Sequence, residues 1–316
     1  MLHSSKEQFE PSQWRLIVED VPRSGPANMA IDQAIAESAA EGTSPPTLRF
    51  YRWSPPAVSI GRYQPSSEID FDAATNLGYE VVRRSTGGRA ILHIDELTYS
   101  VAASRDEPRV QGSVMDSYLR LSNGLLAGLA NLGVHADKAD AHVRAGKDVS
   151  AACFEVPSAY EITVEGRKLI GSAQSRRRNY VLQHGTLPLK GDITRLLSVL
   201  ILTETDRKAL AEQLALRACV LSTALDLQNA PPAPLSTTEF PSEGSPLVPQ
   251  DEAINMRSLE SLFYAAVNAL CQGFAKTLNL DFSDKLVSTA PSTAEMARAA
   301  QLIREQYGSD SWTFSK

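Results

Sequence analysis

The sequence predicts an α+β protein. Between residues 14 and 228, runs typical of β-strands are interspersed with helical segments, without the regular strand–helix–strand order of a doubly wound sheet. Hydrophobic residues make up 43% of the 316-residue chain, which allows a sizeable core and excludes global disorder. The chain is therefore expected to fold as a sheet with helices packed against it.

The first expected elements are a strand at residues 14–20 and a helix at residues 26–40, whose apolar residues recur at the spacing of one helix face. Residues 158–174 alternate around Glu165-Gly166 and predict a β-hairpin. Further strands are expected at residues 48–53, 57–61, 79–84, 89–93, 97–102 and 181–189. Further helices are expected at residues 114–132, 192–199, 204–216, 259–280 and 293–307.

A proline-rich stretch divides the chain. Six of the 18 prolines fall within residues 229–250, which predicts a linker or an extended arm. Residues 14–228 then form the main domain, and residues 251–316 form a helical C-terminal extension.

Composition excludes several classes of protein. The net charge of −6 argues against a general nucleic-acid binder. Apolar runs are shorter than the roughly 18 residues of a membrane span, and the N-terminus lacks the apolar region of a secretory signal. Three cysteines, odd in number and far apart, disfavour a disulfide framework. A cytoplasmic protein with no membrane attachment is expected.

The first motif is the basic Gly-Gly segment RRSTGGRA at residues 83–90, followed by His93. Gly87 and Gly88 allow a ligand to lie against the backbone, and the arginines could hold a carboxylate or a phosphate. The alternative is a tight turn between two strands with exposed arginines. His93, like His184 further along, is either a base or a hydrogen-bonded structural residue.

The second motif pairs Cys153, in an expected loop, with Lys168 at the start of the hairpin's return strand. A lysine ammonium near a thiol lowers the thiol pKa and favours the nucleophilic thiolate. The alternatives are a buried structural cysteine and a solvated turn lysine.

The third motif is KLIGSAQSRRR at residues 168–178. Gly171 and Ser172 interrupt a strand, which often marks the close approach of a ligand. Residues 176–178 form a compact positive patch that either docks an acidic partner or is a solvated strand end. His135 and His142 lie near two aspartates, which is weak evidence for a metal, and no metal site is assigned.

Taken together, these motifs resemble the biotin/lipoate A/B protein ligase family. RRSTGGRAILHIDELTYS is similar to its lipoyl-pocket signature, and ACFEVPSAYEITVEGRKLIGSAQSRRRNYVLQHG is similar to the branch of LipM-type octanoyltransferases. The opening segment WRLIVEDVPRSGPANMAIDQAI also matches that pattern. The resemblance covers residues 14–228 well. It implies the biotin/lipoate ligase catalytic fold, a mixed β-sheet flanked by helices.

The resemblance also implies roles for individual residues. Cys153 occupies the position of the family's acyl-thioester nucleophile. Lys168 occupies the position of the lysine that lowers the pKa of that cysteine. An acyl pocket is implied between the Gly-Gly turn and the GSAQ strand. The pocket residues would be Arg84, Ser85, Thr86, Gly87, Gly88, His93, Gly171, Ser172, Ala173 and His184. The docking residues for acidic partners would be Arg176, Arg177 and Arg178.

The implied reaction moves octanoyl from acyl carrier protein to a lipoyl-domain lysine, such as that of glycine cleavage H protein, without a cofactor. The alternatives are an ATP-dependent lipoate–protein ligase, an amidotransferase between lipoyl domains, and a non-catalytic acyl-lysine or carrier-protein binding module. Arg89, where such ligases usually carry a third glycine, opposes the ligase. A monomer is the simplest expectation for the oligomeric state.

Overall fold

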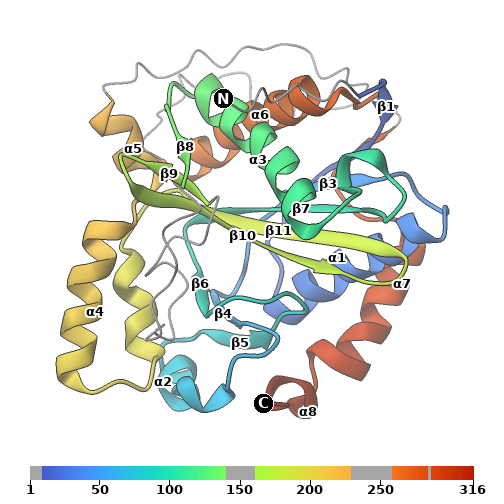
Figure 1. The fold of residues 1–316 in the computed structure, drawn as a ribbon. Helices are drawn as coiled ribbons and strands as arrows, with labels where there is room; N and C mark the ends of the chain where they lie inside the picture. The colour runs from blue at the N-terminus through green and yellow to red at the C-terminus, as the bar shows by residue number, and fades with distance from the viewer. Residues whose placement is uncertain (1–8, 140–160, 229–257, 284–285) are drawn as a thin grey trace.

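The computed structural model describes residues 9–139, 161–228, 258–283 and 286–316. Cys153 and the expected linker at residues 229–250 lie outside these ranges. Among the described residues, the strands form sheets of eight, three and two strands, with helices on both sides of the largest (Figure 1). The expected α+β class with a mixed, helix-flanked sheet is confirmed.

The eight-stranded sheet has the order β13-β2-β3-β7-β11-β10-β9-β8. The strands β13, β2 and β3 are parallel, and the others run antiparallel to their neighbours. Their bounds are β2 (Arg15–Val18), β3 (Thr47–Tyr51), β7 (Glu96–Ser104), β8 (Asp137–Lys138), β9 (Ile162–Val164), β10 (Arg167–Arg176), β11 (Tyr180–Pro188) and β13 (Val287–Ser288). The predicted hairpin is the β9–β10 pair. Its turn residues, Glu165 and Gly166, both have positive φ.

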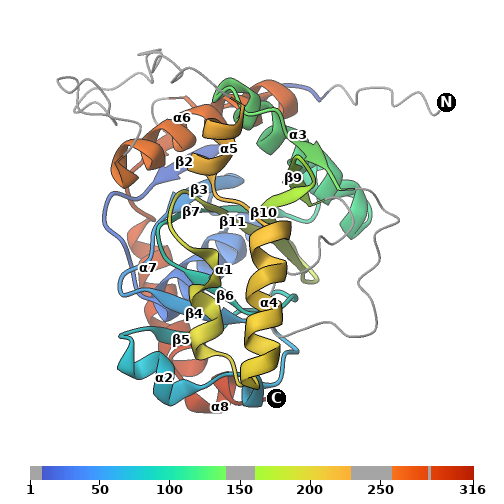
Figure 2. The same ribbon diagram turned by 90° about the vertical axis from the view of Figure 1, so that its left-hand side faces the viewer.

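Both faces of the large sheet are buried, because successive residues of its strands belong to cores on opposite sides. Leu48 and Phe50 of β3 join a core with α3 (Val114–Asn131) and α6 (Leu259–Leu278). Tyr51, next along the strand, joins a second core with α1 (Gly25–Ala40) and α7 (Thr293–Leu302). Successive strand side chains point to opposite faces, so a sheet covered on both sides needs apolar residues at consecutive positions. Figure 2 shows the sheet between these helix layers.

The small sheet β5-β4-β6 lies beside the face that carries α1 (Figure 1). Its strands are β4 (Ala57–Ile60), β5 (Glu80–Arg83) and β6 (Ile91–His93). A third apolar cluster joins it to α2 (Phe71–Asn76), the 3-10 helix Ile193–Val199 and α4 (Glu204–Arg217). The loop between β5 and β6 carries the Gly-Gly motif, so this sheet fixes both ends of that loop.

The C-terminal segment packs on the main body. Strand β13 pairs with β2, and β12 (Leu280–Asp281) pairs with β1 (Ser12–Gln13). Arg15 of β2 forms a bidentate ion pair with Glu295 of α7. Burial alone would raise the pKa of Glu295, but the Arg15 guanidinium and the cap residue Ser292 hold it below its usual value. The tail therefore shares the core that supports the site.

Most expected elements are confirmed, with small shifts at their ends. The expected helix at residues 192–199 is a 3-10 helix. Three short helices were not predicted: α2, α5 (Leu221–Leu227) and α8 (Asp310–Thr313). They have at most seven residues, too few for a helical repeat of apolar residues to stand out. No described helix has both the length and the apolar character needed to cross a lipid bilayer.

Candidate active site

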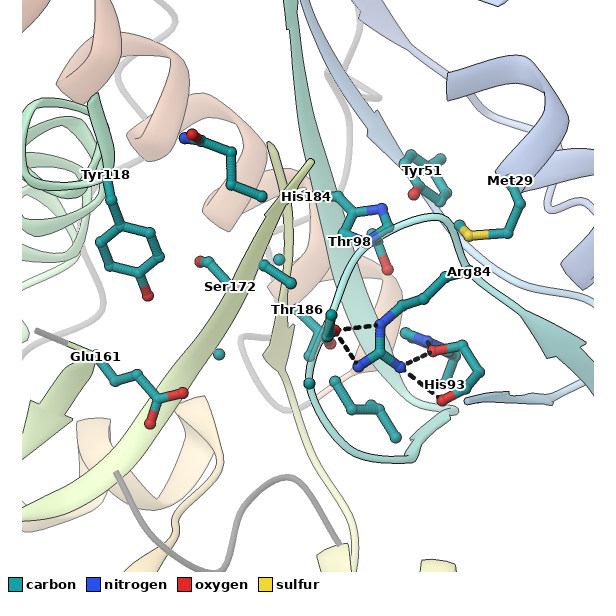
Figure 3. A pocket seen from close by; sticks show the side chains of 18 of the residues that line it. Met29, Tyr51, Arg84, His93, Thr98, Tyr118, Glu161, Ser172, His184 and Thr186 are labelled. Carbon is teal, nitrogen blue, oxygen red and sulfur yellow. Dashed lines mark hydrogen bonds between the residues drawn. The ribbon is translucent and has the colours of Figure 1, made fainter. Parts of the chain in front are cut away.

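A pocket of about 290 Å³ lies between the loop at residues 84–90 and the strands β10 and β11 (Figure 3). Its volume is near the lower end of the range for ligand pockets, which suits a small or slender ligand. It is lined by Met29, Tyr51, Trp53, Ser59, Arg84, Gly87, Gly88, Ile91, His93, Thr98, Val114, Tyr118, Glu161, Gly171, Ser172, Ala173, Gln174, His184, Gly185 and Thr186.

The 84–90 loop is held in shape by its own arginine. The Arg84 guanidinium donates to the carbonyl oxygens of Gly87 and Arg89, at 2.8 Å each, and to that of Ser59 at 2.7 Å. A Cβ on Gly61 would lie 1.9 Å from the Gly88 oxygen, so only glycine at position 61 lets the loop approach β4. Arg84 therefore binds backbone at the pocket wall, and the alternative of an exposed turn arginine is wrong for this residue.

The neighbouring Arg83 is also structural. Its guanidinium donates to the carbonyl oxygens of Gly61 and Gln64, and to that of Thr313 in the last helix. The arginine pair thus ties the loop to β4 on one side and to the C-terminal helix on the other. This is a role that the sequence motif did not indicate.

His93 is part of a closed hydrogen-bond network at the pocket wall. Its Nε2 lies 2.7 Å from the Ser59 hydroxyl and its Nδ1 lies 2.7 Å from a Glu96 oxygen. The ring stacks on Trp53 with centroids 3.9 Å apart. Thr98 and Thr186 also donate to Glu96. Because both ring nitrogens are engaged, the geometry favours the structural alternative for His93 over a base.

His184 connects the loop to a buried charge cluster. Its Nε2 lies 2.7 Å from the Thr86 hydroxyl, and its Nδ1 lies 3.5 Å from an Asp32 oxygen. Arg49, fully buried, binds Asp32 at 2.7 Å and Glu19 at 3.1 Å. Burial lowers the pKa of His184, although Asp32 acts in the opposite direction. A neutral His184 thus holds Thr86, and with it the loop, against β11.

Lys168 and Glu161 form a buried ion pair at the pocket. The Lys168 ammonium lies 2.6 Å from a Glu161 oxygen, and the lysine is fully buried. Glu161 lines the pocket, with its carboxylate directed toward it in Figure 3. The sequence alternative of a solvated turn lysine is therefore wrong. The low dielectric screens the Lys168 ammonium weakly, so it acts on charged groups near the pocket, although the Glu161 carboxylate offsets part of its charge.

Two of the three cysteines are poor nucleophiles. Burial raises the pKa of the Cys219 thiol to about 11, and it raises the pKa of Cys271, which is fully buried in α6, still further. A thiol with a raised pKa is inert at neutral pH. Cys153, the predicted nucleophile, lies outside the described residues.

The three arginines at the end of β10 have different surroundings. Arg176 lies in the strand, half-buried, and donates to the Ser117 hydroxyl and to the Val110 carbonyl oxygen. Arg177 and Arg178 are exposed in the turn to β11. Positive charge is thus presented outward mainly by Arg177 and Arg178.

Most of the predicted pocket residues line the pocket. Ser85 and Thr86 do not, although Thr86 supports His184.

The sequence did not indicate that α1, β3, β4 and α3 also contribute residues to the pocket. It also missed Glu161, which lies near the start of the predicted hairpin. A single carboxylate at that position belongs to no recognisable motif in the sequence. In the described residues, no group of three His, Cys, Asp or Glu side chains is arranged to hold a metal ion.

Octanoyltransferases share this sequence over two thirds of the chain or more. An octanoyltransferase LipM of Carboxydothermus hydrogenoformans is 38% identical over 95% of this chain and 98% of its own. One from Symbiobacterium thermophilum is 40% identical over 96% of this chain and 98% of its own. One from Moorella thermoacetica is 47% identical over 67% of this chain and 78% of its own.

Solved structures share the fold. A bipartite lipoate protein ligase from Thermoplasma acidophilum has a TM-score of 0.68 at 23% identity, with 96% of each chain covered. A lipoate-protein ligase A bound with ATP has a TM-score of 0.68 at 24% identity, with 96% of this chain and 99% of that chain covered. Residues 24–236 match the lipoyl protein ligase A/B catalytic domain. The chain therefore belongs to the lipoyl protein ligase A/B family, in the group that contains the LipM octanoyltransferases.

Proposed function

We propose that this protein transfers an octanoyl group from acyl carrier protein to a lysine of a lipoyl domain, such as that of glycine cleavage H protein. The observation that carries the proposal is identity of 34–47% to proteins named octanoyltransferase LipM. The 290 Å³ pocket supports it, because it offers an acyl chain a largely buried site. The reaction is proposed to occur in the cytoplasm, where an unpaired thiol stays reduced.

The pocket can hold a hydrocarbon although many of its residues are polar. Thr98, Thr186 and His93 direct their polar atoms at Glu96, and the Trp53 ring covers the His93 ring. Methyl groups and ring faces are then left for the ligand. Each buried methylene contributes about 0.8 kcal/mol, so an octanoyl chain gains several kcal/mol of binding.

The chemistry is proposed to use Cys153 as the nucleophile. Its thiolate attacks the thioester of octanoyl-acyl carrier protein, the carrier thiolate leaves, and an acyl-enzyme forms in a nearly balanced exchange. The acceptor amine then attacks the acyl-enzyme and displaces the Cys153 thiolate, and the proton that the amine loses passes to solvent, where the released carrier thiolate can take it up. Amide formation from a thioester is downhill, so ATP is not needed. The burial of Cys219 and Cys271 supports Cys153 as the thiol in use.

Lys168 is proposed to lower the pKa of Cys153. Its ammonium is buried at the pocket and fixed by Glu161 at 2.6 Å. A buried cation favours a nearby thiolate by direct charge attraction.

The test of the function is a transfer assay without ATP. The purified protein is incubated with octanoyl-acyl carrier protein, and its intact mass is measured. We expect a gain of one octanoyl group, which is lost again when a lipoyl-domain protein is added and acquires it. No adduct, together with ATP-dependent attachment of free lipoate, would instead support a ligase. Octanoyl transfer from a preloaded lipoyl domain but not from the carrier would support an amidotransferase.

Arg177 and Arg178 are proposed to dock these partners, and Arg176 to support the turn from beneath. Both exposed arginines directly follow β10, the strand that also lines the pocket. Replacing both with glutamate is expected to raise the KM for the carrier protein several-fold and to flatten its dependence on salt. A matched pair, Arg304→Glu and Lys208→Glu, changes the net charge equally on other elements. Equal KM values and salt slopes in the two double variants would contradict the docking role.

A further inference from the structure

One end of the pocket is closed inside the protein. Met29, Tyr51 and Trp53 line that end and are 3%, 0% and 9% exposed. Val114, on the α3 side of the pocket, is 51% exposed. Figure 3 shows Met29 and Tyr51 on the opposite side of the view from Tyr118 and Glu161. The pocket therefore has a buried end against α1 and β3, and a more open end toward α3.

Two of the three residues at the buried end are fixed by polar contacts. The Tyr51 hydroxyl donates to Asp32 at 2.8 Å, and the Arg49 guanidinium lies 3.8 Å from the ring centroid. The Trp53 indole N–H donates to Thr98 at 2.7 Å. These rings form rigid walls that cannot move without breaking the buried network.

Met29 differs from its two neighbours. It extends from α1 and belongs to the apolar cluster that contains Tyr51 and Val82. A methionine side chain is unbranched and flexible, so its terminal atoms fill whatever space the surroundings leave. It is thus the side chain at the buried end whose length can change without removing a buried hydrogen bond.

The direction of the acyl chain follows from the proposed function, on which this inference rests. The reacting carbonyl must lie near the Lys168–Glu161 pair, since Lys168 is proposed to activate the thiol. The hydrocarbon tail then extends to the opposite end. We propose that Met29 stops the tail there and so determines the length of the acyl group that the enzyme accepts.

The expected effect of shortening Met29 follows from the energy of burying methylenes. Met29→Ala removes the γ, δ and ε atoms, which opens room for about two methylenes. At about 0.8 kcal/mol each, the preference for decanoyl over octanoyl should rise roughly 15-fold. Met29→Phe fills the same end and should shift the preference toward hexanoyl.

The experiment is a competition among acyl donors. Equal amounts of hexanoyl-, octanoyl-, decanoyl- and dodecanoyl-acyl carrier protein are offered with a lipoyl-domain acceptor, and the acceptor products are quantified by mass. The ratio of products is independent of the amount of active enzyme, so a partly unfolded variant still reports its preference.

Two control variants separate chain length from general loosening of the core. Ile35→Ala removes a side chain that is 1% exposed, on the same helix and in the same apolar cluster, but which does not line the pocket. It should keep the wild-type ratio. Met29→Leu keeps the side-chain volume and should also keep it.

Opposite shifts in Met29→Ala and Met29→Phe, with unchanged ratios in both controls, support the inference. Wild-type ratios in both Met29 variants overturn it while leaving the proposed function intact. A shift in Ile35→Ala as large as that in Met29→Ala also overturns it, because core loosening would then account for both. A wild-type protein that transfers no acyl group from any donor overturns the proposed function and this inference with it.

Discussion

Replacing Cys153 with alanine is expected to reduce octanoyl transfer by at least about 10³-fold, since loss of a covalent nucleophile removes the whole acyl-enzyme route. The variant should also fail to gain mass from octanoyl-acyl carrier protein. The measurement is the initial rate of acceptor octanoylation together with the intact mass of the enzyme.

The controls for this substitution are the other two cysteines. Cys219→Ala and Cys271→Ala remove thiols whose pKa values are raised by burial, so both should retain the mass adduct and most of the activity. An adduct that persists in Cys153→Ala would assign the nucleophile elsewhere. An adduct lost in Cys219→Ala, in a variant that still melts cooperatively, would point to Cys219.

Replacing Lys168 with methionine is expected to slow alkylation of Cys153 by about tenfold or more at neutral pH. The positive charge that favours the thiolate is removed, so the pKa of Cys153 rises and a smaller fraction is ionised at a given pH. The rate of iodoacetamide alkylation is measured against pH. Cys219, with a pKa of about 11, and Cys271 contribute little near neutrality. The pH profile of Cys153 alkylation should move to higher pH in the variant.

This substitution also affects stability. Glu161 is 3% exposed and would lose its cation, and breaking a buried ion pair typically costs about 3–5 kcal/mol of unfolding free energy. The double variant Lys168→Met, Glu161→Gln removes both charges and should recover much of that stability. It should not recover the alkylation rate. If the double variant restored both, Lys168 would have a structural role only.

The order of elements was readable from the sequence because each long element carries its own periodic pattern. The Glu165-Gly166 turn was predicted because it stands at the centre of an alternating run, and in the structure both residues adopt positive φ. The short helices α2, α5 and α8 were not predicted, because each is too short to show a helical repeat of apolar residues and its helical state depends on packing against other segments.

Only part of the candidate site could be predicted from the sequence. The Gly-Gly loop and the GSAQ strand were identified because glycines interrupt the strand pattern there. The burial of Lys168 was not, because a lysine looks the same in sequence whether it is solvated or paired. Its partner Glu161 lies seven positions away, a spacing without meaning until β9 and β10 fold into a hairpin.

By itself, the sequence determined the α+β class, the family and two of the segments that border the pocket, the Gly-Gly loop and the GSAQ strand, since these depend on local patterns and on residue identity. The tertiary structure alone decided that Arg83 and Arg84 bind backbone carbonyls, that Lys168 is buried beside Glu161, and that Met29 lines the pocket as a buried residue. The physical reason is that burial and pairing belong to the assembled core. The folded chain brings together side chains from α1, the two sheets and the C-terminal helix, and no spacing in the sequence relates these side chains to one another.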